Sequence, residues 1–483
     1  MKIFMCAAIV AAAGVVSKCG SEQRGPSVVV IVGDGRTFSS PACPGSSGWG
    51  DAMPQFFQAG VVATNFASDK NGQAVAMRPT FVIAGFGQGD AEAKTPLPDF
   101  RNRIQQLIAA AKKINATPVL VTPPVLRTND PVSAKTFTNM PPPADAQPYA
   151  DAIREIGAAE KVTVLDLRGE MQKTYREIGD RACWFLHPPA DITKEVATNV
   201  RTNREWRGPK PRNPQYFSST GADTLAQWIA TLIRESDSSL RNLLRDPAGP
   251  PSPDYKLVWS DEFDGSTWTN NWSCRDPGKR KDGFNDPACI RLDGEGHLVI
   301  DVRRETNGVH AGIASTDRKH QWKYGYFECR CTIADDDGYW SAFWMMSNHV
   351  GDPQSGRGKI DDTANNGTEI DICECMKVQG DVVHQNLHWN GYGDDHKSSP
   401  FDTFVPDLRK QKWHVFAVDW RPDGYTFYVD GRRAWETTDA ISQTEEYIIL
   451  SIEIGKWAGD VSKAKLPQQV MFDWVRVYQR PAK

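Results

Sequence analysis

The stretch Gly367-Thr-Glu-Ile-Asp-Ile-Cys-Glu374 alternates acidic and apolar residues, a pattern that predicts a β-strand with one acidic face. Glu369 and Asp371 are two residues apart and therefore share a face of the strand. Glu374 lies five residues after Glu369, which would place it on the opposite face of a regular strand. A single β-bulge near Cys373 supplies the extra residue that returns Glu374 to the acidic face. Three acids then line this face, while the two isoleucines between them point into a core.

Three acids on one strand face have the composition that retaining glycoside hydrolysis requires. One ionised carboxylate attacks the sugar and one protonated carboxyl donates to the leaving oxygen, and the two must come within roughly 5–5.5 Å. The backbones of Glu369 and Glu374 are roughly 13–16 Å apart along a strand, so the side chains must lean together over Asp371. Asp371 can share a proton and help to separate the pKa values of the two Glu. Taken alone, the pattern also fits a solvated strand face.

The segments around this strand have the rhythm of short strands separated by turn residues. Examples are His297-Leu-Val-Ile-Asp-Val302, Tyr326-Phe-Glu-Cys-Arg330 and Tyr425-Thr-Phe-Tyr-Val429, the last followed by an Asp430-Gly431 turn. No helical pattern of comparable strength occurs among them. Residues 255–480 are therefore predicted to form an all-β sandwich or barrel.

The N-terminal half has a different pattern. Val28-Val-Val-Ile-Val32 is a continuous apolar run, typical of a parallel strand covered on both faces. Ile104, Leu107, Ile108 and Ala111 fall on one face of a helix. Alternating strands and helices predict a three-layer α/β domain over residues 26–240. The Pro-rich residues 245–254 can continue neither a helix nor a sheet and predict a semi-stiff linker.

Length, charge and the N-terminal end fit an exported two-domain protein. A chain of 483 residues is too long for one ordinary core, and its net charge of −4 gives no reason to expect nucleic acid as a partner. Residues 1–19 read as a signal peptide, and Val16-Ser-Lys-Cys19 resembles a lipoprotein cleavage box, so a lipid anchor at Cys19 is an alternative to plain secretion. No later apolar run predicts a membrane span. We expect a secreted, periplasmic or cell-surface monomer.

Ten cysteines are present, of which Cys6 would leave with the signal peptide and Cys19 lies at its edge. The remaining eight make disulfides plausible in an oxidising compartment. Cys329 with Cys331, and Cys373 with Cys375, share strand faces, so a zinc site is conceivable. Buried small hydrophobic side chains, or one or two cross-strand disulfides, are the favoured interpretation.

The second half closely resembles glycoside hydrolase family 16. The resemblance rests on ordered blocks that cover nearly all of residues 255–480: Leu257-Val-Trp-Ser-Asp-Glu-Phe-Asp-Gly265, Lys323-Tyr-Gly-Tyr-Phe-Glu-Cys-Arg330, Trp340-Ser-Ala-Phe-Trp344, Glu369 to Glu374, Phe427-Tyr-Val-Asp-Gly431 and Phe472-Asp-Trp-Val-Arg-Val-Tyr478. It implies a concanavalin A-like jelly roll with an open cleft. By the family pattern Glu369 is the nucleophile, Glu374 the acid/base and Asp371 the helper. The extra residue is similar to the bulged branch, which includes laminarinases, agarases, porphyranases and κ-carrageenases.

The same resemblance implies further site residues. Trp344 matches a pattern that favours a sugar-stacking floor over core packing, and Trp340 fits either role. His388 matches a position near the acid/base, where it either bonds the cleft acids or is a structural histidine. Trp457 could close one end of the cleft or pack under a loop. No cofactor is required, but a structural calcium is implied near two acids, Glu262 and Asp473. Glu328 and Arg330 fit either cleft lining or a cross-strand charge pair.

The substrate is predicted less sharply. We favour a β-1,3- or mixed-linked glucan over a galactan of the agar, porphyran or carrageenan type. Sulfated galactans would call for cations beside the cleft, and Arg357, Lys359 and Lys397 are the candidates. A transglycosylase and a non-catalytic glycan-binding protein are the alternative classes.

The first half resembles SGNH hydrolases, particularly rhamnogalacturonan acetylesterase-like members, which imply a flavodoxin-like parallel sheet. The family's Gly-Asp-Ser turn is Gly33-Asp34-Gly35 here, and its Gly-x-Asn-Asp is Gly87-Gln-Gly-Asp90. The closing Asp-x-x-His aligns with Asn213-Pro-Gln-Tyr216, and Ser39 and Ser40 lie off the turn. Because nucleophile, oxyanion donor, base and orienting acid are all changed, we predict a catalytically inactive domain.

Overall fold

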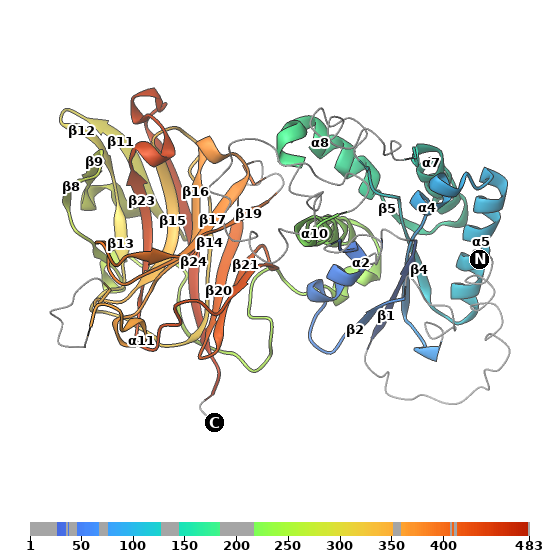
Figure 1. Ribbon diagram of the computed structural model, residues 1–483, viewed down its shortest axis with the longest axis horizontal. Helices are drawn as coiled ribbons and strands as arrows, with labels where there is room; N and C mark the ends of the chain where they lie inside the picture. The colour runs from blue at the N-terminus through green and yellow to red at the C-terminus, as the bar shows by residue number, and fades with distance from the viewer. Residues whose placement is uncertain are drawn as a thin grey trace. The chain divides into compact units, whose positions relative to one another are not determined.

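The chain forms two compact units in the computed structural model (Figure 1). The first comprises residues 1–198 and 206–246, and the second residues 199–205 and 247–483. The structure describes residues 27–34, 37, 46–66, 76–126, 144–183, 217–350, 359–405, 408–409 and 413–481. The predicted signal peptide, Cys19, Gly35, Ser39, Ser40, residues 213–216 and Arg357 lie outside these ranges. Over the described ranges, no helix has the length and apolar character needed to cross a membrane.

The first unit is built on a five-stranded sheet in the order β2-β1-β3-β4-β5, and every neighbouring pair is parallel. Its strands are β1 (Val28–Gly33), β2 (Val62–Asn65), β3 (Phe81–Gly85), β4 (Thr117–Val121) and β5 (Thr163–Leu165). Its helices are α2 (Trp49–Ala52), α4 (Gln88–Ala93), α5 (Leu97–Lys113), α7 (Gln147–Glu160), α8 (Leu167–Cys183) and α10 (Ser219–Glu235). The predicted α/β architecture with a parallel sheet is confirmed.

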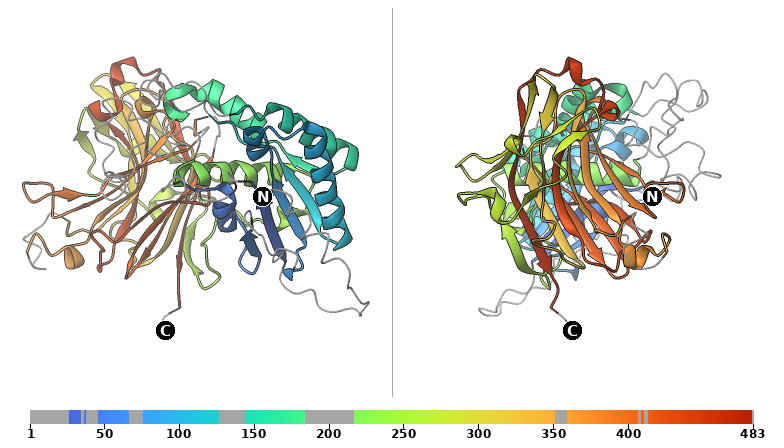
Figure 2. Two further views of the ribbon diagram at one scale, coloured as in Figure 1. Left: turned by 45° about the vertical axis from the view of Figure 1, so that its right-hand side comes forward. Right: turned by 90° about the vertical axis from the view of Figure 1, so that its left-hand side faces the viewer.

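Helices cover both faces of this sheet. The apolar face of α5 packs with α7 against alternate strand residues, which include Val30, Val82 and Leu120. α2 and α10 lie together on the other side of the sheet (Figure 2). The residues of β1 that point each way, Val30 and Ile31, are both almost fully buried. This explains why the strand is a continuous apolar run rather than an alternating one.

The second unit is a sandwich of two sheets, so the predicted all-β architecture is confirmed. An eleven-stranded sheet has the order β22-β21-β20-β14-β24-β11-β12-β9-β8, with β10 beside β11 and β6 beside β24. An eight-stranded sheet has the order β18-β17-β16-β15-β23-β13-β7, with β19 beside β17. The strands are β6 (Lys256–Asp261), β7 (Ser273–Cys274), β8 (Gly278–Arg280), β9 (Gly283–Asn285), β10 (Ile290–Leu292), β11 (Leu298–Glu305), β12 (Gly308–Ala311), β13 (Ile313–Ser315), β14 (Gly325–Cys331), β15 (Tyr339–Met346), β16 (Glu369–Met376), β17 (Val382–Trp389), β18 (Lys397–Ser398), β19 (Phe401–Phe404), β20 (His414–Arg421), β21 (Gly424–Val429), β22 (Arg432–Thr437), β23 (Tyr447–Ile454) and β24 (Gln468–Gln479).

The core of the sandwich lies between the two sheets. Phe327 and Phe416 of the larger sheet, and Phe343 and Leu450 of the smaller one, belong to one buried cluster. Alternate residues of β15 and β23 enter this core, so the intervening residues of both strands lie on the outer face of the smaller sheet.

The cysteines correct one expectation. All six whose side chains the structure describes are free thiols: Cys274, Cys289, Cys329, Cys331, Cys373 and Cys375. The last four are buried in the core between the sheets, where they serve as small apolar side chains. Disulfides predicted from the even number of cysteines are therefore not found at these six positions.

The end of the predicted linker is held by the second unit. The backbone N–H of Gly249 donates to Oε2 of buried Glu328 at 2.7 Å, and the Tyr255 hydroxyl donates to Asp419. Arg330, two residues after Glu328, pairs with Asp473 of β24 at 2.5 Å. Both Glu328 and Arg330 thus belong to the larger sheet, and the cross-strand charge pair is the interpretation that holds for Arg330.

Candidate active site

The three acids lie on β16 of the smaller sheet, where the predicted bulge is confirmed. On β15, Phe343 pairs with Cys373 and Trp344 pairs with Asp371, so Ile372 is the extra residue on β16. The register on β17 shifts over the same interval. Ile372 and Cys373 both enter the core, and Glu374 returns to the side that carries Glu369 and Asp371. We call this side of the smaller sheet the acidic face.

Glu374 is held in the form that can donate a proton. Burial raises its pKa to about 8, and the neighbouring charges of Asp371 and then Glu369 act in the same direction. The indole N–H of Trp340 donates to Oε1 of Glu374 at 2.8 Å and partly opposes this rise. A carboxyl with such a pKa is protonated at neutral pH, as a general acid must be.

Glu369 and Asp371 lie in different surroundings although they are two residues apart. Glu369 is partly exposed and accepts a hydrogen bond from the hydroxyl of Tyr392. Asp371 is only 3% exposed, and burial followed by the charge of Glu369 raises its pKa well above the usual range. This strand therefore carries a buried carboxyl whose protonated form is favoured, Asp371, beside an accessible carboxyl, Glu369.

The histidine beside the proposed acid/base is not the one that the sequence indicated. His388 pairs in register with Glu369, and its Nε2 lies 3.4 Å from Oδ2 of Asp371. The residue opposite Glu374 is His384, whose Nδ1 lies 2.5 Å from Oδ1 of Asp402. The bulge shifts Glu374 by one residue along β17, so His384 rather than Val383 lies opposite it, while His388 faces Glu369.

Three predicted tryptophans lie near the acids, and they differ in exposure. Trp344 and Trp340 are buried, and Nε1 of Trp344 donates to Ser451 at 3.0 Å. Trp457, in a short 3-10 helix (Lys456–Ala458), is 45% exposed and packs edge-on against Trp340 with 5.1 Å between ring centroids. Trp457 is thus the one of the three with a broad accessible ring surface.

Cations from one segment, residues 275–281, lie over the acidic face. The guanidinium of Arg275 lies 5.1 Å from the ring centroid of Trp344, and the ammonium of Lys281 lies 4.5 Å from that of Trp340. Arg280 and Lys281 both pair with Glu453 of β23, at 2.7 and 3.2 Å. The sequence did not single out these residues or Tyr392, because they are distant from the acidic strand along the chain and follow no strand pattern.

The structure does not bring together the two acids suggested for calcium. Glu262 is engaged by Arg476 through two contacts of 2.9 Å, and Asp473 by Arg330 and, at 3.8 Å, by His297. Within the part of the chain that the structure describes, the one group of three side chains able to hold a metal is Glu369, Asp371 and His388. Their nearest ligand atoms lie within 4.8 Å of one another. The structural calcium stays a prediction.

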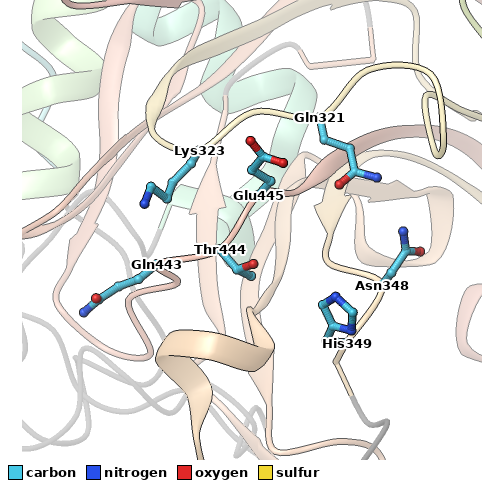
Figure 3. Close-up of a pocket in the computed structure, with 7 residues that line it drawn as sticks. All are labelled: Gln321, Lys323, Asn348, His349, Gln443, Thr444 and Glu445. Atoms are coloured by element: carbon cyan, nitrogen blue, oxygen red, sulfur yellow. The ribbon is translucent and has the colours of Figure 1, made fainter. Parts of the chain in front are cut away.

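A separate pocket of about 330 Å³ lies at the loops that flank β15 and β23 (Figure 3). It is lined by Gln321, Lys323, Asn348, His349, Gln443, Thr444 and Glu445. Its lining is polar and contains none of the predicted site residues.

In the first unit, the turn that follows β1 contains Asp34, whose carboxylate is held by a backbone hydrogen bond. Oδ2 of Asp34 accepts a hydrogen bond from the backbone N–H of Gly89 at 2.8 Å. Gly89 stands where the resembled family places its oxyanion donor. Asp90, the next residue, pairs with Arg103 at 2.5 Å.

A two-sheet sandwich with three acids on one bulged strand defines a domain of the glycosidase class. Residues 285–476 match the sequence model for glycosyl hydrolases family 16, and the second unit therefore carries a domain of that family.

Curated relatives agree with this assignment. The chain is 27% identical to a beta-glucanase of Rhodothermus marinus over 49% of this chain and 90% of the relative. It is 27% identical to the clotting factor G alpha subunit of Tachypleus tridentatus over 47% of this chain and 34% of the relative. It is also 27% identical to a keratan-sulfate endo-1,4-beta-galactosidase of Sphingobacterium multivorum over 47% and 56%. The chain thus spans about a third of the clotting factor subunit and about half of the galactosidase.

Among solved structures, a laminarinase from Flavobacterium sp. UMI-01 aligns at 24% identity with 46% of this chain and 100% of its own. The TM-score of this alignment is 0.39.

Proposed function

We propose that the second unit is an endo-acting, retaining β-glycoside hydrolase of polysaccharides. Glu369 is the nucleophile, Glu374 the acid/base, and Asp371 the helper that lies between them. The observation that carries the proposal is the bulge at Ile372, which gathers three carboxyl groups on one face. The raised pKa of Glu374, about 8, supports its role as the acid.

The reaction would proceed in two displacements. In the first, the Glu369 carboxylate attacks the anomeric carbon, the glycosidic C–O bond breaks, and the proton of Glu374 passes to the leaving oxygen. In the second, water attacks the same carbon, gives its proton to the Glu374 carboxylate, and the bond to Glu369 breaks. Two inversions leave the product with the β configuration of the substrate.

The names of the relatives support two classes of polymer. The name beta-glucanase favours a β-linked glucan, and the name keratan-sulfate endo-1,4-beta-galactosidase favours a polymer with β-galactosidic bonds. Both stay candidate substrates. A protein of this kind acts outside the cytoplasm, and the predicted signal peptide supports export.

The test is to count reducing ends released from laminarin, lichenan, agarose, porphyran and κ-carrageenan. Wild type should act on at least one polymer, Glu369→Gln on none, and the product should first appear as the β anomer by NMR. Glu436→Gln is the matched control, because Glu436 is an exposed acid on β22 of the other sheet. Equal activity in wild type and Glu369→Gln, or an α product, would refute the assignment. Products longer than the substrate would indicate a transglycosylase instead.

For the first unit we propose an SGNH-like domain without esterase activity. The bond between Asp34 and the Gly89 N–H supports this, because the carboxylate occupies a backbone donor that an oxyanion would need. An acetylesterase assay on the Glu369→Gln protein should show no turnover. Measurable release of acetate from an acetylated pectin would contradict the proposal.

A further inference from the structure

One cation over the acidic face lacks the partners that its neighbours have. The guanidinium of Arg275 rests between the rings of Trp344 and Tyr447, 5.1 and 5.9 Å from their centroids. Its Nη1 is buried and has no hydrogen-bond acceptor within the described structure, and its Nη2 donates to the sulfur of Met346 at 3.3 Å. A buried N–H without an acceptor is destabilising, so a site that retains one gains from an acceptor supplied by a ligand.

The nearest carboxylate neutralises Arg275 poorly. Oδ2 of Asp276 lies 3.3 Å from Nε, but the Asp276 side chain is 65% exposed, where an ion pair contributes little. By contrast, Arg280 and Lys281 share Glu453, whose side chain is only 5% exposed. Because one buried carboxylate serves two cations there, the segment as a whole carries an excess of positive charge over the acidic face.

The cations also lie level with the proposed catalytic acids. Trp344, beneath Arg275, pairs with Asp371 on the neighbouring strand, and Trp340, beside Lys281, donates to Glu374. One face of each buried tryptophan is thus covered by a cation, which removes ring surface on which a neutral sugar could stack.

On the basis of the proposed function, we infer that the substrate is an anionic β-linked polysaccharide. Arg275, assisted by Lys281, binds the negatively charged substituent of this polymer. Sulfate esters and uronate carboxylates share the required chemistry, since both present oxygens that accept charge-assisted hydrogen bonds from a guanidinium. The inference selects the sulfated or otherwise acidic polymers among the candidates and disfavours laminarin and lichenan.

Binding to the Glu369→Gln protein tests this without depending on turnover. Affinity electrophoresis would compare κ-carrageenan with its desulfated form, a β-linked polyuronate with its carboxyl-reduced form, and laminarin. We expect at least about tenfold tighter binding to one anionic polymer than to its neutral form, weakening as salt increases. Tighter binding of κ-carrageenan than of its desulfated form identifies sulfate as the substituent. Tighter binding of the polyuronate than of its carboxyl-reduced form identifies carboxylate. Equal binding to charged and neutral forms would overturn the inference.

Substitutions in the Glu369→Gln protein identify the side chain that causes the preference for the charged polymer. Adding Arg275→Gln should reduce the preference for the charged polymer by about tenfold or more, and Lys281→Gln by less. Arg433→Gln removes the same charge from an exposed position on β22 of the other sheet and should change nothing. Arg275→Lys, which keeps the charge, should retain part of the preference and covers the case in which Arg275→Gln does not fold. An unchanged preference in folded Arg275→Gln would refute the role of Arg275.

The outcomes separate this inference from the proposed function. Cleavage of laminarin without any preference for anionic polymers would leave the hydrolase standing and remove the inference. Preferential binding of an anionic polymer by a protein that cleaves nothing would support the inference about binding and remove the proposed hydrolase activity.

Discussion

The indole N–H of Trp340 donates a 2.8 Å hydrogen bond to Oε1 of Glu374, so a buried aromatic side chain fixes the position of the proposed acid. A donor to a carboxylate stabilises the ionised form, and here it works against the burial that raises the pKa to about 8. Two opposed effects on one carboxyl therefore set the pH range in which it can donate a proton.

The first prediction concerns that pH range. Because Glu374 must be protonated to assist the departing sugar, kcat/KM of wild type should fall as pH rises through about 8. Trp340→Phe removes the stabilising donor, so the alkaline limb should move to higher pH. The measurement is kcat/KM between pH 5 and 10. Trp413→Phe, at a partly buried position stacked on His297, is the control; a limb that stays or moves down in Trp340→Phe would contradict the prediction.

The second prediction concerns Asp371. Burial raises its pKa well above the usual range and so favours its protonated form, which means that Asp371→Asn should resemble the native side chain and keep activity within about tenfold. Asp371→Ala leaves a gap and removes the polar group, and should lose about 100-fold or more. Steady-state kinetics at pH 6.5 distinguishes the two. If Asn is as damaging as Ala, Asp371 must exchange its proton during the reaction.

The third prediction concerns Tyr392, whose hydroxyl donates to Glu369. Tyr392→Phe should lower kcat more than it raises KM, by about tenfold or more, because the carboxylate loses a charge-assisted hydrogen bond that positions it. Tyr324→Phe, at a partly buried tyrosine packed on Trp420, should have no such effect. A change confined to KM would show that Tyr392 serves substrate binding rather than the position of Glu369.

The fourth prediction concerns stability. Glu446 is fully buried, its Oε1 accepts from the Thr368 backbone N–H at 3.0 Å, and burial raises its pKa from 4.5 to about 8. A folded pKa above the unfolded one means that stability is complete below about pH 4.5 and is lost as pH rises through about 8. The difference between these two pKa values corresponds to at most about 5 kcal/mol in the free energy of unfolding.

Glu446→Gln keeps the acceptor but cannot ionise, so it should be more stable than wild type at pH 8 to 9 and closer to it at pH 5. Urea unfolding of the second unit at both pH values measures the difference. Glu445→Gln, at the adjacent exposed residue, should leave the pH dependence unchanged. An equal effect of Glu446→Gln at both pH values would contradict ionisation as the cause.

Much of this arrangement follows from local patterns in the sequence. Alternation along residues 369–376, with one residue too many, predicted both the shared face and the bulge, because a strand has only two sides. Apolar runs likewise predicted the parallel sheet of the first unit. The cations over the acidic face could not be predicted in this way. Arg275 reaches Trp344 across two other strands, and such a contact depends on how strands far apart in the chain are ordered in the sheet.

His388 shows a second limit of prediction from the sequence. A pattern in the sequence placed His388 on the correct strand, but which acid it meets depends on the register between β16 and β17, which the pattern does not give. The exposure of the tryptophan side chains could not be predicted from the sequence either. Trp340, Trp344 and Trp457 are chemically alike, and only packing leaves Trp457 open.

The bulge also constrains how this strand can change by insertion or deletion. If the strand kept all its residues but lost the bulge, an ordinary pleat would carry Glu374 inward among phenylalanines and turn Cys375 outward in its place. Deletion of Ile372 together with the bulge would instead leave Glu369, Asp371 and Glu374 at alternate positions of a regular strand, so the three acids would keep one face. The length of this strand and its bulge are therefore coupled, and a change in one preserves the acidic face only when the other changes with it.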